Sequence, residues 1–470
     1  MFKKKGKLIH FYTHEELRES LTRLFHAFSL SNKELFLVGG CIRDCMLDKE
    51  PKDYDLTTNA TPNEVKSILD KIGLDYFDSG IKHGTLTILD RQFNKSYEIT
   101  TYRCDGKYSD GRHPDEITFA NTLEEDLKRR DFTINSFAYD FLSEETLMLD
   151  ESYFKDLEHG IIRTVGDPIQ RFSEDALRMM RALRFSAQLN FTISKDTYNA
   201  IAQLSVNLKY ISKERIRDEL TKILMSDNPQ VLELFSITDL EKYAFDGLTP
   251  IKDIIECEHQ NPWHYTDVFH HTMDVVKRLS KTFVLRWSGF FHDMGKPSVK
   301  CLKENTVDHY HFHGHQEVSC EIALKIMKIL KFSNDDSDLI YKFVKYHDSN
   351  LVEYKNSRFK KVLVDIGIDN FSDYMKLRMS DAFAHRLSQS TYYAIDYIDA
   401  IWKRFDKTLI KNEALTLNDL KVNGYDMMTL GLRNKEIGDM LKYLLERVLD
   451  DSSLNTHETL LELTKEKLEK

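Results

Sequence analysis

Residues 35–44 read Leu-Phe-Leu-Val-Gly-Gly-Cys-Ile-Arg-Asp. The apolar run predicts a buried β-strand, and Gly39 and Gly40 predict a tight turn that ends it. Because glycine has no Cβ, the backbone N–H groups of this turn can approach a ligand that other side chains would keep away. Residues 41–47 can then form a helix, whose N-terminus favours an anion such as a triphosphate. The stretch therefore predicts a phosphate-binding turn between a strand and a helix.

Two carboxylates, Asp53 and Asp55, follow this turn closely. On a β-strand their i, i+2 spacing points both side chains to one face, where they can share a divalent cation. A Gly-Gly turn or an Asp-x-Asp pair alone is common in loops. The two together, in this order, are typical of metal-dependent nucleotidyl transfer.

The composition is that of a soluble globular protein. The 470 residues are 41% hydrophobic and 30% charged, which is compatible with about three domains. No apolar stretch approaches the ~18 residues that a membrane span needs, and the basic start is not followed by the apolar region of a signal peptide. Six cysteines without a Cys-x-x-Cys pair indicate reduced thiols and a cytoplasmic location. The net charge of −10 argues against a general nucleic-acid binder, although local basic patches can override the sum.

The pattern predicts an α+β protein, in which a head with a mixed or antiparallel β-sheet precedes an all-α body. Strands are expected at residues 85–89, 97–103 and 117–119, because these runs alternate and are rich in β-branched residues. The polar loop 104–114 is either an ordinary hairpin loop or a lid over the metal site. Beyond the first third of the chain there are few Gly and Pro residues, which favours helices.

Residues 122–135 are expected to be helical. Asp131 and Asn135 would then be i, i+4 neighbours on one helix face. A carboxylate and an amide there could hold ribose hydroxyls, with Arg130 on a phosphate. The alternative is a charged helix end in solvent.

A second helix is expected to begin at Glu174, with Asp175 and Arg178 as an informative pair. Aspartate accepts from an exocyclic amino group, and arginine donates to the adjacent ring nitrogen. Cytosine and adenine present that pattern, whereas uracil and guanine present a carbonyl there. The alternative is an i, i+3 surface salt bridge. Arg181 and Arg184 continue the series, with Arg184 expected to face away from Asp175.

Eleven of the eighteen histidines fall between His259 and His385. A lone histidine is most often a core residue, but a spaced set of histidines and aspartates on helices favours a metal site. Imidazoles and carboxylates together suit Mn²⁺, Ni²⁺, Zn²⁺ or Fe²⁺, and are typical of metal-assisted phosphoester hydrolysis. The candidate ligands are His271, His292, Asp293 and Asp381, and His315 and His347 could complete a first or a second metal site.

These motifs resemble those of bacterial-type, class II CCA-adding tRNA nucleotidyltransferases of the polymerase-β nucleotidyltransferase superfamily, with an HD domain. The resemblance covers essentially the whole chain. The catalytic motif of the family resembles Gly39-Gly40-x-x-Arg43-Asp44 with Asp53-x-Asp55, and its ribose motif resembles Arg129-Arg130-Asp131. Its amino-acid template for CTP and ATP resembles Glu174-Asp175-x-x-Arg178, and further nucleotide contacts match Arg181 and Arg184. The HD pattern resembles His271, His292-Asp293 and Asp381.

The resemblance implies template-independent addition of C, C and A to the 3′ end of tRNA from CTP and ATP, with release of pyrophosphate. Asp53 and Asp55 would be catalytic and would hold Mg²⁺, while Gly39, Gly40 and Arg43 would steady the phosphates. The HD pattern implies phosphohydrolase activity on a phosphomonoester or a 2′,3′-cyclic phosphate. The partners would be tRNA, ATP and CTP, without a membrane, and no oligomeric state follows from the sequence.

The resemblance also divides the chain into four parts. A nucleotidyltransferase head is expected at 1–150, a helical neck for nucleotide and tRNA recognition at 151–255, an HD domain at 256–392 and a helical tail at 393–470.

Five other functions compete with this interpretation. A poly(A) polymerase shares the catalytic head, and an A-adding-only enzyme is harder to exclude. A CC-adding-only enzyme would be expected to lack the loop 104–114. A phosphohydrolase with a vestigial head is disfavoured by intact Asp53, Asp55, Asp175 and Arg178, and a non-catalytic tRNA-binding protein would have no use for two complete acidic metal sites.

Overall fold

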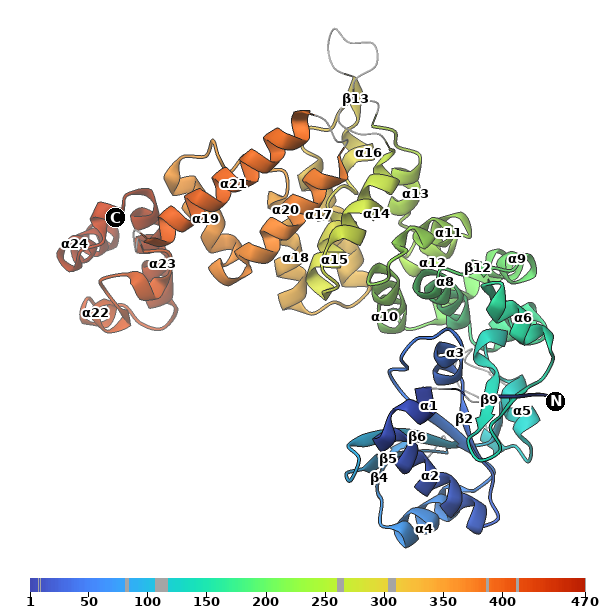
Figure 1. Ribbon diagram of the computed structural model, residues 1–470. Helices are drawn as coiled ribbons and strands as arrows, with labels where there is room; N and C mark the ends of the chain where they lie inside the picture. The colour runs from blue at the N-terminus through green and yellow to red at the C-terminus, as the bar shows by residue number, and fades with distance from the viewer. Residues whose placement is uncertain are drawn as a thin grey trace. The chain divides into compact units, whose positions relative to one another are not determined.

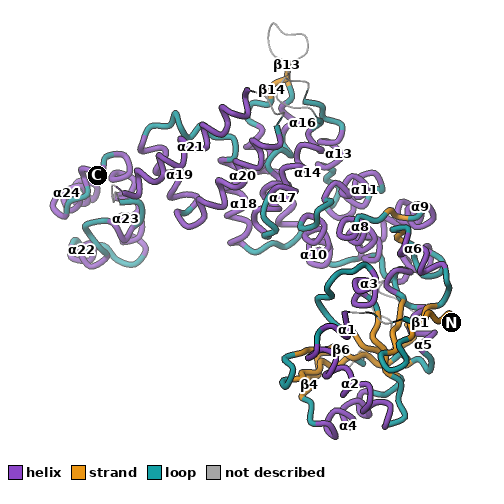
Figure 2. Tube along the Cα trace, in the orientation of Figure 1, coloured by secondary structure: helices purple, strands orange, loops and turns teal. Residues whose placement is uncertain are grey.

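The computed structural model describes residues 1–469 except residues 7, 9, 81–83, 106–116, 260–265, 303–309, 386–388 and 411–413. The chain forms two compact units. The first comprises Met1–Ile223 with Leu234–Leu248, and the second comprises Leu224–Glu233 with Thr249–Lys470. Most strands belong to the first unit, and the second is almost entirely helical, as Figure 2 shows by colour.

An eight-stranded sheet organises the first unit. Its strand order is β1-β10-β9-β2-β3-β6-β5-β4, and in this sheet β3 and β6 are the parallel pair. The mixed sheet and the helical remainder confirm the predicted α+β class. The strands are β1 (Phe2–Lys5), β2 (Leu35–Val38), β3 (Asp55–Thr58), β4 (Asp75–Gly80), β5 (Thr85–Asp90), β6 (Lys95–Thr101), β9 (Phe137–Asp140) and β10 (Glu145–Met148).

The register of three central strands positions the acidic residues. Val38 at the end of β2 pairs with Asp55 at the start of β3, and Asp55 pairs in turn with Glu98 on β6. Residues directly opposite each other on neighbouring strands project to the same face of a sheet. Asp55 and Glu98 therefore lie side by side, next to the turn that follows β2.

The helices of the first unit bury their apolar faces against this sheet and against one another. Figure 1 shows α2 beside the sheet with α4 next to it. Thr61 and Glu64 form a capping box at the start of α4, with Pro62 in its first turn. The helices are α1 (His10–Thr13), α2 (Glu15–Leu30), α3 (Gly40–Met46), α4 (Pro62–Ile72), α5 (Leu123–Lys128), α6 (Ser152–Glu158), α7 (Pro168–Glu174), α8 (Leu177–Leu189), α9 (Lys195–Leu204), α10 (Lys213–Leu224) and α12 (Leu240–Ala244), while α11 (Leu232–Ile237) crosses the unit boundary.

Three two-stranded pairings accompany these elements. β7 (Arg103–Asp105) pairs with β8 (Ile117–Phe119), and β11 (Ile161–Ile162) pairs in parallel with β12 (Thr192–Ile193). The hairpin of β13 (Cys301–Leu302) and β14 (Tyr310–His311) belongs to the second unit. Residues 106–116, most of the loop considered as a lid, lie outside the described residues.

Two helix predictions need correction. The helix expected over 122–135 ends at Lys128, because the next segment bonds elsewhere: the N–H of Val165 donates to the carbonyl of Asp131, and Phe132 bridges Thr164. A 3₁₀ turn, Thr133–Asn135, follows. The prediction that a helix begins at Glu174 is also wrong.

At that point α7 ends and Asp175 is extended, with φ −142°. Its carboxylate accepts the N–H of Leu177, at the start of α8. A short side chain that bonds its own backbone competes with helix formation, which explains the break between the two helices.

The second unit is a helical array. Its elements are α13 (Pro250–Ile255), α14 (Val268–Arg278), α15 (Phe283–Phe291), α16 (Lys296–Val299), α17 (His315–Ile329), α18 (Asn334–Tyr346), α19 (Asn356–Ile366), α20 (Phe371–Ala384), α21 (Gln389–Ile410), α22 (Gly424–Thr429), α23 (Lys435–Asp450) and α24 (His457–Leu468). One apolar core joins α14, α15 and α18–α21, and another joins α22–α24.

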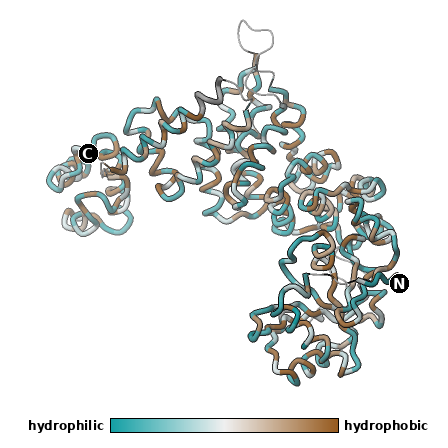
Figure 3. The backbone as a smooth tube through the Cα atoms, viewed as in Figure 1, coloured by the Kyte–Doolittle hydropathy of each residue, from teal (hydrophilic) through white to brown (hydrophobic). Residues whose placement is uncertain are grey.

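Hydrophilic and hydrophobic segments alternate along the helices (Figure 3), as amphipathic packing requires. Of the helices that the structure describes, none combines the length and the apolar character needed to cross a membrane.

Candidate functional site

One cavity of about 730 Å³ gathers every residue that the sequence analysis proposed for nucleotide binding and transfer. These residues come from the turn after β2, from β3, from the segment after α5 and from α8. They are Gly39, Gly40, Arg43, Asp53, Asp55, Arg130, Asp131, Asn135, Asp175, Arg178, Arg181 and Arg184.

The cavity is strongly charged. Among the residues that the structure describes, eight arginines and five acidic residues line it. The cavity lining is therefore net positive although the whole chain carries −10. A concave site with this balance favours a polyanion.

The acidic end of the cavity contains three carboxylates rather than two. Asp55 is the first residue of β3, whereas Asp53 precedes the strand. The prediction that both carboxylates lie on one strand is therefore only partly correct. Glu98, opposite Asp55 on β6, lines the same cavity. Burial raises the pKa of Asp55, and the charges of Glu98 and Asp53 raise it further, while Arg130 opposes them.

Sequence reasoning missed Glu98. The alternation of β6 shows which face of the sheet Glu98 lies on. It does not show that Glu98 is the neighbour of Asp55, because that depends on the order of the strands in the sheet.

The turn after β2 requires glycine at its first position. Gly39 has φ +77°, and a Cβ there would lie 3.0 Å from Nη1 of Arg130. The positive φ strains any other residue here, and a Cβ would also require the guanidinium to shift. The N-terminus of α3 then begins at Gly40, as the sequence predicted.

A continuous chain of hydrogen bonds orders the basic end. Arg43 donates from Nε and Nη2 to Oδ1 of Asp44 at 2.8 and 2.7 Å, and from Nη1 to Oδ1 of Asn135 at 2.6 Å. Asn135 donates to Oδ1 of Asp131 at 3.2 Å, and Oδ2 of Asp131 accepts from Nε of Arg181 at 2.8 Å. Asp131 and Asn135 therefore meet as predicted, although through an extended segment and a 3₁₀ turn.

The ion pair with Arg181 has a consequence for acid stability. Burial alone would raise the pKa of Asp131, but Arg181 and Asn135 lower it to about 2, against 3.8 for the unperturbed group. Stabilisation from this carboxylate is fully present above the unperturbed pKa and is lost as the pH falls through the folded one. We measure the free energy of unfolding in urea at pH 5 and at pH 2.5. Between these pH values we expect the free energy of unfolding of the wild-type protein to fall by about 2 kcal/mol more than that of Asp131→Asn. Equal losses in both proteins would contradict this assignment.

Asp175 and Arg178 both line the cavity, and each side chain bonds a partner other than the i, i+3 neighbour considered as the alternative. Nη1 of Arg178 donates to Oε2 of Glu174 at 2.7 Å, and Nη2 donates to the carbonyl of Arg129 at 3.2 Å. Oδ2 of Asp175 accepts from Arg215 on α10 at 3.2 Å. The two side chains are thus held separately, by different partners.

Arg184 does not face away from Asp175, contrary to expectation. Both side chains line the cavity. Asp175 precedes α8 in an extended conformation, so the direction of its side chain does not follow the helical periodicity of α8. Nε of Arg184 lies 3.2 Å from Oε2 of the buried Glu219. Burial lowers the pKa of Arg184 to about 10, and the neighbouring charge of Arg181 lowers it as well.

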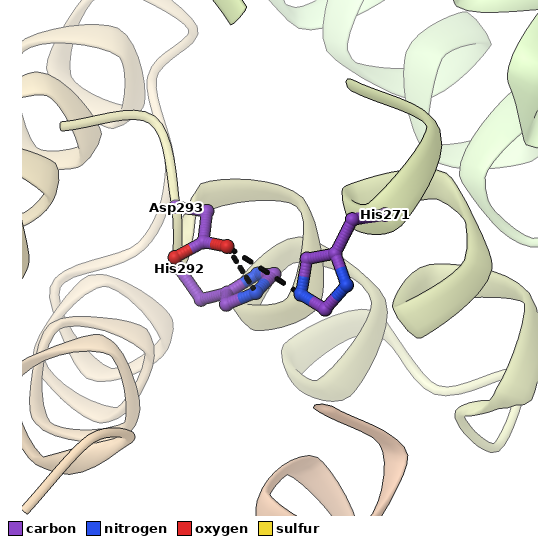
Figure 4. Close-up of side chains that lie close together, drawn as sticks. All are labelled: His271, His292 and Asp293. Carbon is purple, nitrogen blue, oxygen red and sulfur yellow. Dashed lines mark ion pairs between the residues drawn. The ribbon is translucent and has the colours of Figure 1, made fainter. Parts of the chain in front are cut away.

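The second unit contains a separate cluster of histidines and aspartates. Figure 4 shows His271, His292 and Asp293 directed toward one another, with ion pairs from Asp293 to both histidines. Asp381 on α20 completes the set, with Oδ1 3.1 Å from Nε2 of His271. The expected ligands therefore meet from three separate helical segments.

Asp293 also faces the other two predicted histidines. Oδ2 lies 3.1 Å from His292 and 3.5 Å from His271, whereas Oδ1 lies 3.3 Å from His315 and 3.8 Å from His347. One carboxylate thus joins two pairs of imidazoles. His385, which sequence reasoning missed, lies with His271 and Asp381 in a further ligand group.

Backbone carbonyls bond one ring nitrogen of three of these histidines. Nδ1 of His292, His315 and His347 each lies 2.6–2.9 Å from the carbonyl three residues earlier. Since a carbonyl only accepts, each Nδ1 carries a hydrogen, and each Nε2 is directed toward the other side chains of the cluster. Burial lowers the pKa of His347 to about 3, so this ring stays neutral, which is the form that binds metals.

The sequence analysis also missed a buried lysine beside this cluster. Nζ of Lys296 lies 2.6 Å from Oδ2 of Asp293 and 3.1 Å from Nε2 of His259. Burial lowers the pKa of His259 to about 2, and the charge of Lys296 lowers it further, so His259 accepts from the lysine. Lys296 follows Asp293 at i, i+3, and this spacing was the only signal in the sequence.

Comparison with known proteins places these two sites in context. A family profile described as "Poly A polymerase head domain" matches residues 35–163, and one described as "Probable RNA and SrmB- binding site of polymerase A" matches residues 190–251. The CCA-adding enzyme of Limosilactobacillus reuteri is 34% identical over 319 residues, which are 65% of this chain and 77% of that protein. The chain belongs to the CCA-adding enzyme family.

Other members match a shorter region at higher identity. The CCA-adding enzymes of Ligilactobacillus salivarius and Leuconostoc mesenteroides are 45% and 49% identical over 227 and 202 residues. The chain spans about half the length of these relatives, 54% and 48%, and the matches cover 47% and 43% of this chain.

Solved structures of CCA-adding enzymes share the fold. The crystal structure of the Bacillus stearothermophilus CCA-adding enzyme in complex with CTP has a TM-score of 0.66 at 23% identity, covering 97% of this chain and 99% of that one. The Thermotoga maritima CCA-adding enzyme complexed with tRNA has a TM-score of 0.55 at 19% identity, covering 100% of both chains. The architecture of the family therefore extends over the second unit as well.

Proposed function

We propose that this family member adds C, C and A to the 3′ end of tRNA, using CTP and ATP and releasing pyrophosphate. The observation that carries the proposal is the single cavity in which eight arginines face a cluster of carboxylates. Its positive lining suits a nucleoside triphosphate, and its acidic end suits the metal-dependent transfer step. The family membership supports tRNA as the acceptor.

The acidic end fits Mg²⁺. Asp53 and Asp55 would hold the cation, and Glu98 adds a third carboxylate beside them. Crowded carboxylates, one with a raised pKa, are the donor set that a hard divalent cation stabilises. When bound, the cation neutralises charge on the triphosphate and acidifies the attacking hydroxyl. Gly39, Gly40 and the nearby arginines would hold the phosphates.

Asp175 and Arg178 would select the base. Asp175 can accept from the exocyclic amino group of cytosine or adenine, while Arg178 donates to the ring nitrogen beside it. Glu174 and Arg215 hold these two side chains from outside the pair, at 2.7 and 3.2 Å. Asp131 and Asn135 would bind the ribose hydroxyls, and Arg130, Arg181 and Arg184 would bind the phosphates.

Exchanging one acceptor of this pair should relax base selection. In Asp175→Asn the amide can also donate, so a carbonyl-bearing base is no longer rejected. We expect kcat/KM for CTP and ATP to fall about 10- to 100-fold and incorporation of UTP to become measurable. Asp218→Asn, an exposed aspartate of α10, is the matched control. Unchanged selectivity in Asp175→Asn would contradict the proposed role.

Nucleotide addition to a defined tRNA tests the proposed function. Purified protein with Mg²⁺ receives a tRNA ending at the discriminator base, with CTP, ATP or both. We expect two added residues from CTP alone and three only with both nucleotides. A long A tail from ATP alone would instead identify a poly(A) polymerase, and growth only on a tRNA that already ends in CC would identify an A-adding enzyme.

We propose a second activity, metal-dependent phosphohydrolysis, for the second unit. The observation that favours it is the convergence of two ring nitrogens on one carboxylate: Nε2 of His315 and Nε2 of His347 lie 3.0 Å apart, and both rings bond a backbone carbonyl through Nδ1. The same two Nε2 atoms lie 3.3 and 3.8 Å from Oδ1 of Asp293. Mn²⁺, Ni²⁺, Zn²⁺ or Fe²⁺ suits these donors.

The ligands of this second centre would be His271, His292, Asp293 and Asp381, with His315 and His347 on the far oxygen of Asp293. When bound, such metals activate water and polarise a phosphoryl oxygen. Phosphate release from a phosphomonoester or from a 2′,3′-cyclic phosphate, measured on metal-loaded protein, tests the activity.

The four-part division of the chain and a cytoplasmic location belong to the same proposal. The parts are the head at 1–150, the neck at 151–255, the HD domain at 256–392 and the tail at 393–470. Five cysteines of the described residues are free thiols, which supports a reducing compartment.

A further inference from the structure

A single aromatic ring lies among the arginines of the cavity. Phe185 on α8 lines the cavity and is 7% exposed. The guanidinium carbons of Arg43, Arg181 and Arg184 lie 5.3, 5.5 and 4.3 Å from its ring centroid. Each distance falls within the range of cation–π attraction.

Three like charges so close together need something to hold them. Each guanidinium has an anionic partner on another side: Asp44 for Arg43, Asp131 for Arg181 and Glu219 for Arg184. An ion pair draws its arginine toward the carboxylate and neutralises it. The ring attracts the same guanidinium without cancelling its charge, so the positive field stays available to a ligand.

The ring itself is rigidly placed. Phe132 meets Phe185 edge to face, at 5.8 Å between centroids and 81° between planes. Phe132 is fully buried and directly follows Asp131, the partner of Arg181. The orientation of Phe185 is therefore set by packing, and not by the arginines around it.

We propose that Phe185 is a positioning residue that holds Arg43, Arg181 and Arg184 in register for the triphosphate. The inference rests on the proposed nucleotide function and assigns the ring a part in it. Arg43 comes from α3, whereas Arg181 and Arg184 come from α8, so the ring joins two separate elements at one phosphate-binding wall. Phe185 need not touch the reacting atoms.

Graded fluorination of the ring tests this electrostatic role. Mono-, di- and trifluorinated phenylalanines placed at position 185 of the full chain keep the shape of the ring closely and progressively weaken its negative face. We expect the Kd for CTP and for ATP, measured by calorimetry, to rise stepwise with fluorination, to about tenfold at the end of the series. KM should rise in parallel, with a smaller change in kcat.

Two further variants separate positioning from packing. Phe185→Leu removes the aromatic face and should raise both Kd values about tenfold. Phe172→Leu on α7 is the control, since Phe172 is fully buried and is not among the described residues that line the cavity. It should lower the Tm and leave both Kd values unchanged.

The outcomes are distinguishable. Equal Kd values across the fluorinated series would overturn the role of Phe185 and leave the proposed function intact. A wild-type chain that binds CTP and ATP with the predicted dependence, yet adds neither to tRNA, would contradict the proposed function alone. A wild-type chain that binds neither nucleotide would overturn both.

Discussion

Replacing Asp55 by asparagine is expected to lower the rate of C and A addition by about a thousandfold or more. The substitution preserves size and the strand pairing of β3 with β2 and β6. It removes one charge from the three carboxylates that we propose to hold Mg²⁺. Because a bound cation contributes several kcal/mol to transition-state stabilisation, losing a ligand costs about three powers of ten in rate.

The control for Asp55→Asn is Asp78→Asn. Asp78 is an exposed aspartate of β4 in the same unit, with 51% of its side chain accessible. Single-turnover addition with saturating CTP, measured across a Mg²⁺ titration, should show the defect in Asp55→Asn only. Activity within tenfold of wild type at saturating Mg²⁺ would exclude Asp55 from the catalytic centre.

Replacing Asp293 by alanine is expected to remove the metal and the phosphohydrolase activity that we propose for the second unit. Asp293 is fully buried, and its two oxygens face two different pairs of histidines. Without it, His315 and His347 lose their carboxylate, and His271 and His292 keep only Asp381. Metal content by mass spectrometry should fall close to zero, and phosphate release should fall by about a thousandfold.

The same substitution should leave nucleotide addition at the level of wild type, because the carboxylates proposed for that reaction lie in the first unit. His313→Ala, an exposed histidine of the second unit, controls for surface histidines that bind metal weakly. Loss of nucleotide addition together with metal would argue against two independent sites.

Local patterns predicted the parts of the fold that depend on neighbouring residues. The apolar run before Gly39 became β2, and the two glycines became the turn into α3. The start of α4 is likewise local, since Thr61 caps it and Pro62 lies in its first turn. In each case the deciding interactions lie within a few residues of one another, so periodicity and cap chemistry were sufficient.

Apart from the helix break at Asp175, which its own side chain causes, the errors arose where contacts between distant segments determine the structure. The helix expected to continue past Lys128 stops because residues near Asp131 bond to residues 163–165. Glu98 and Phe185 were missed for a related reason. One becomes an acidic neighbour of Asp55 only through strand order, and the other meets Arg43 only because α3 and α8 line the same cavity.

The histidine cluster could be predicted as a set but not as an arrangement. The spacing of His271, His292 and Asp381 indicated shared ligation. The structure adds that Asp293 lies between two histidine pairs and that backbone carbonyls fix the ring tautomers. Neither feature has a signature in the sequence, because both depend on how helices far apart in the chain pack together.

One measurement tests the central claim, that a single protein pocket selects C and A without a nucleic-acid template. Wild-type protein is incubated with Mg²⁺, a tRNA ending at the discriminator base and all four nucleoside triphosphates at equal concentration, and the product 3′ ends are sequenced. The account predicts that C, C and A in that order dominate the products and that extension then stops. Products dominated by A tails, or by U and G in place of C and A, would contradict it.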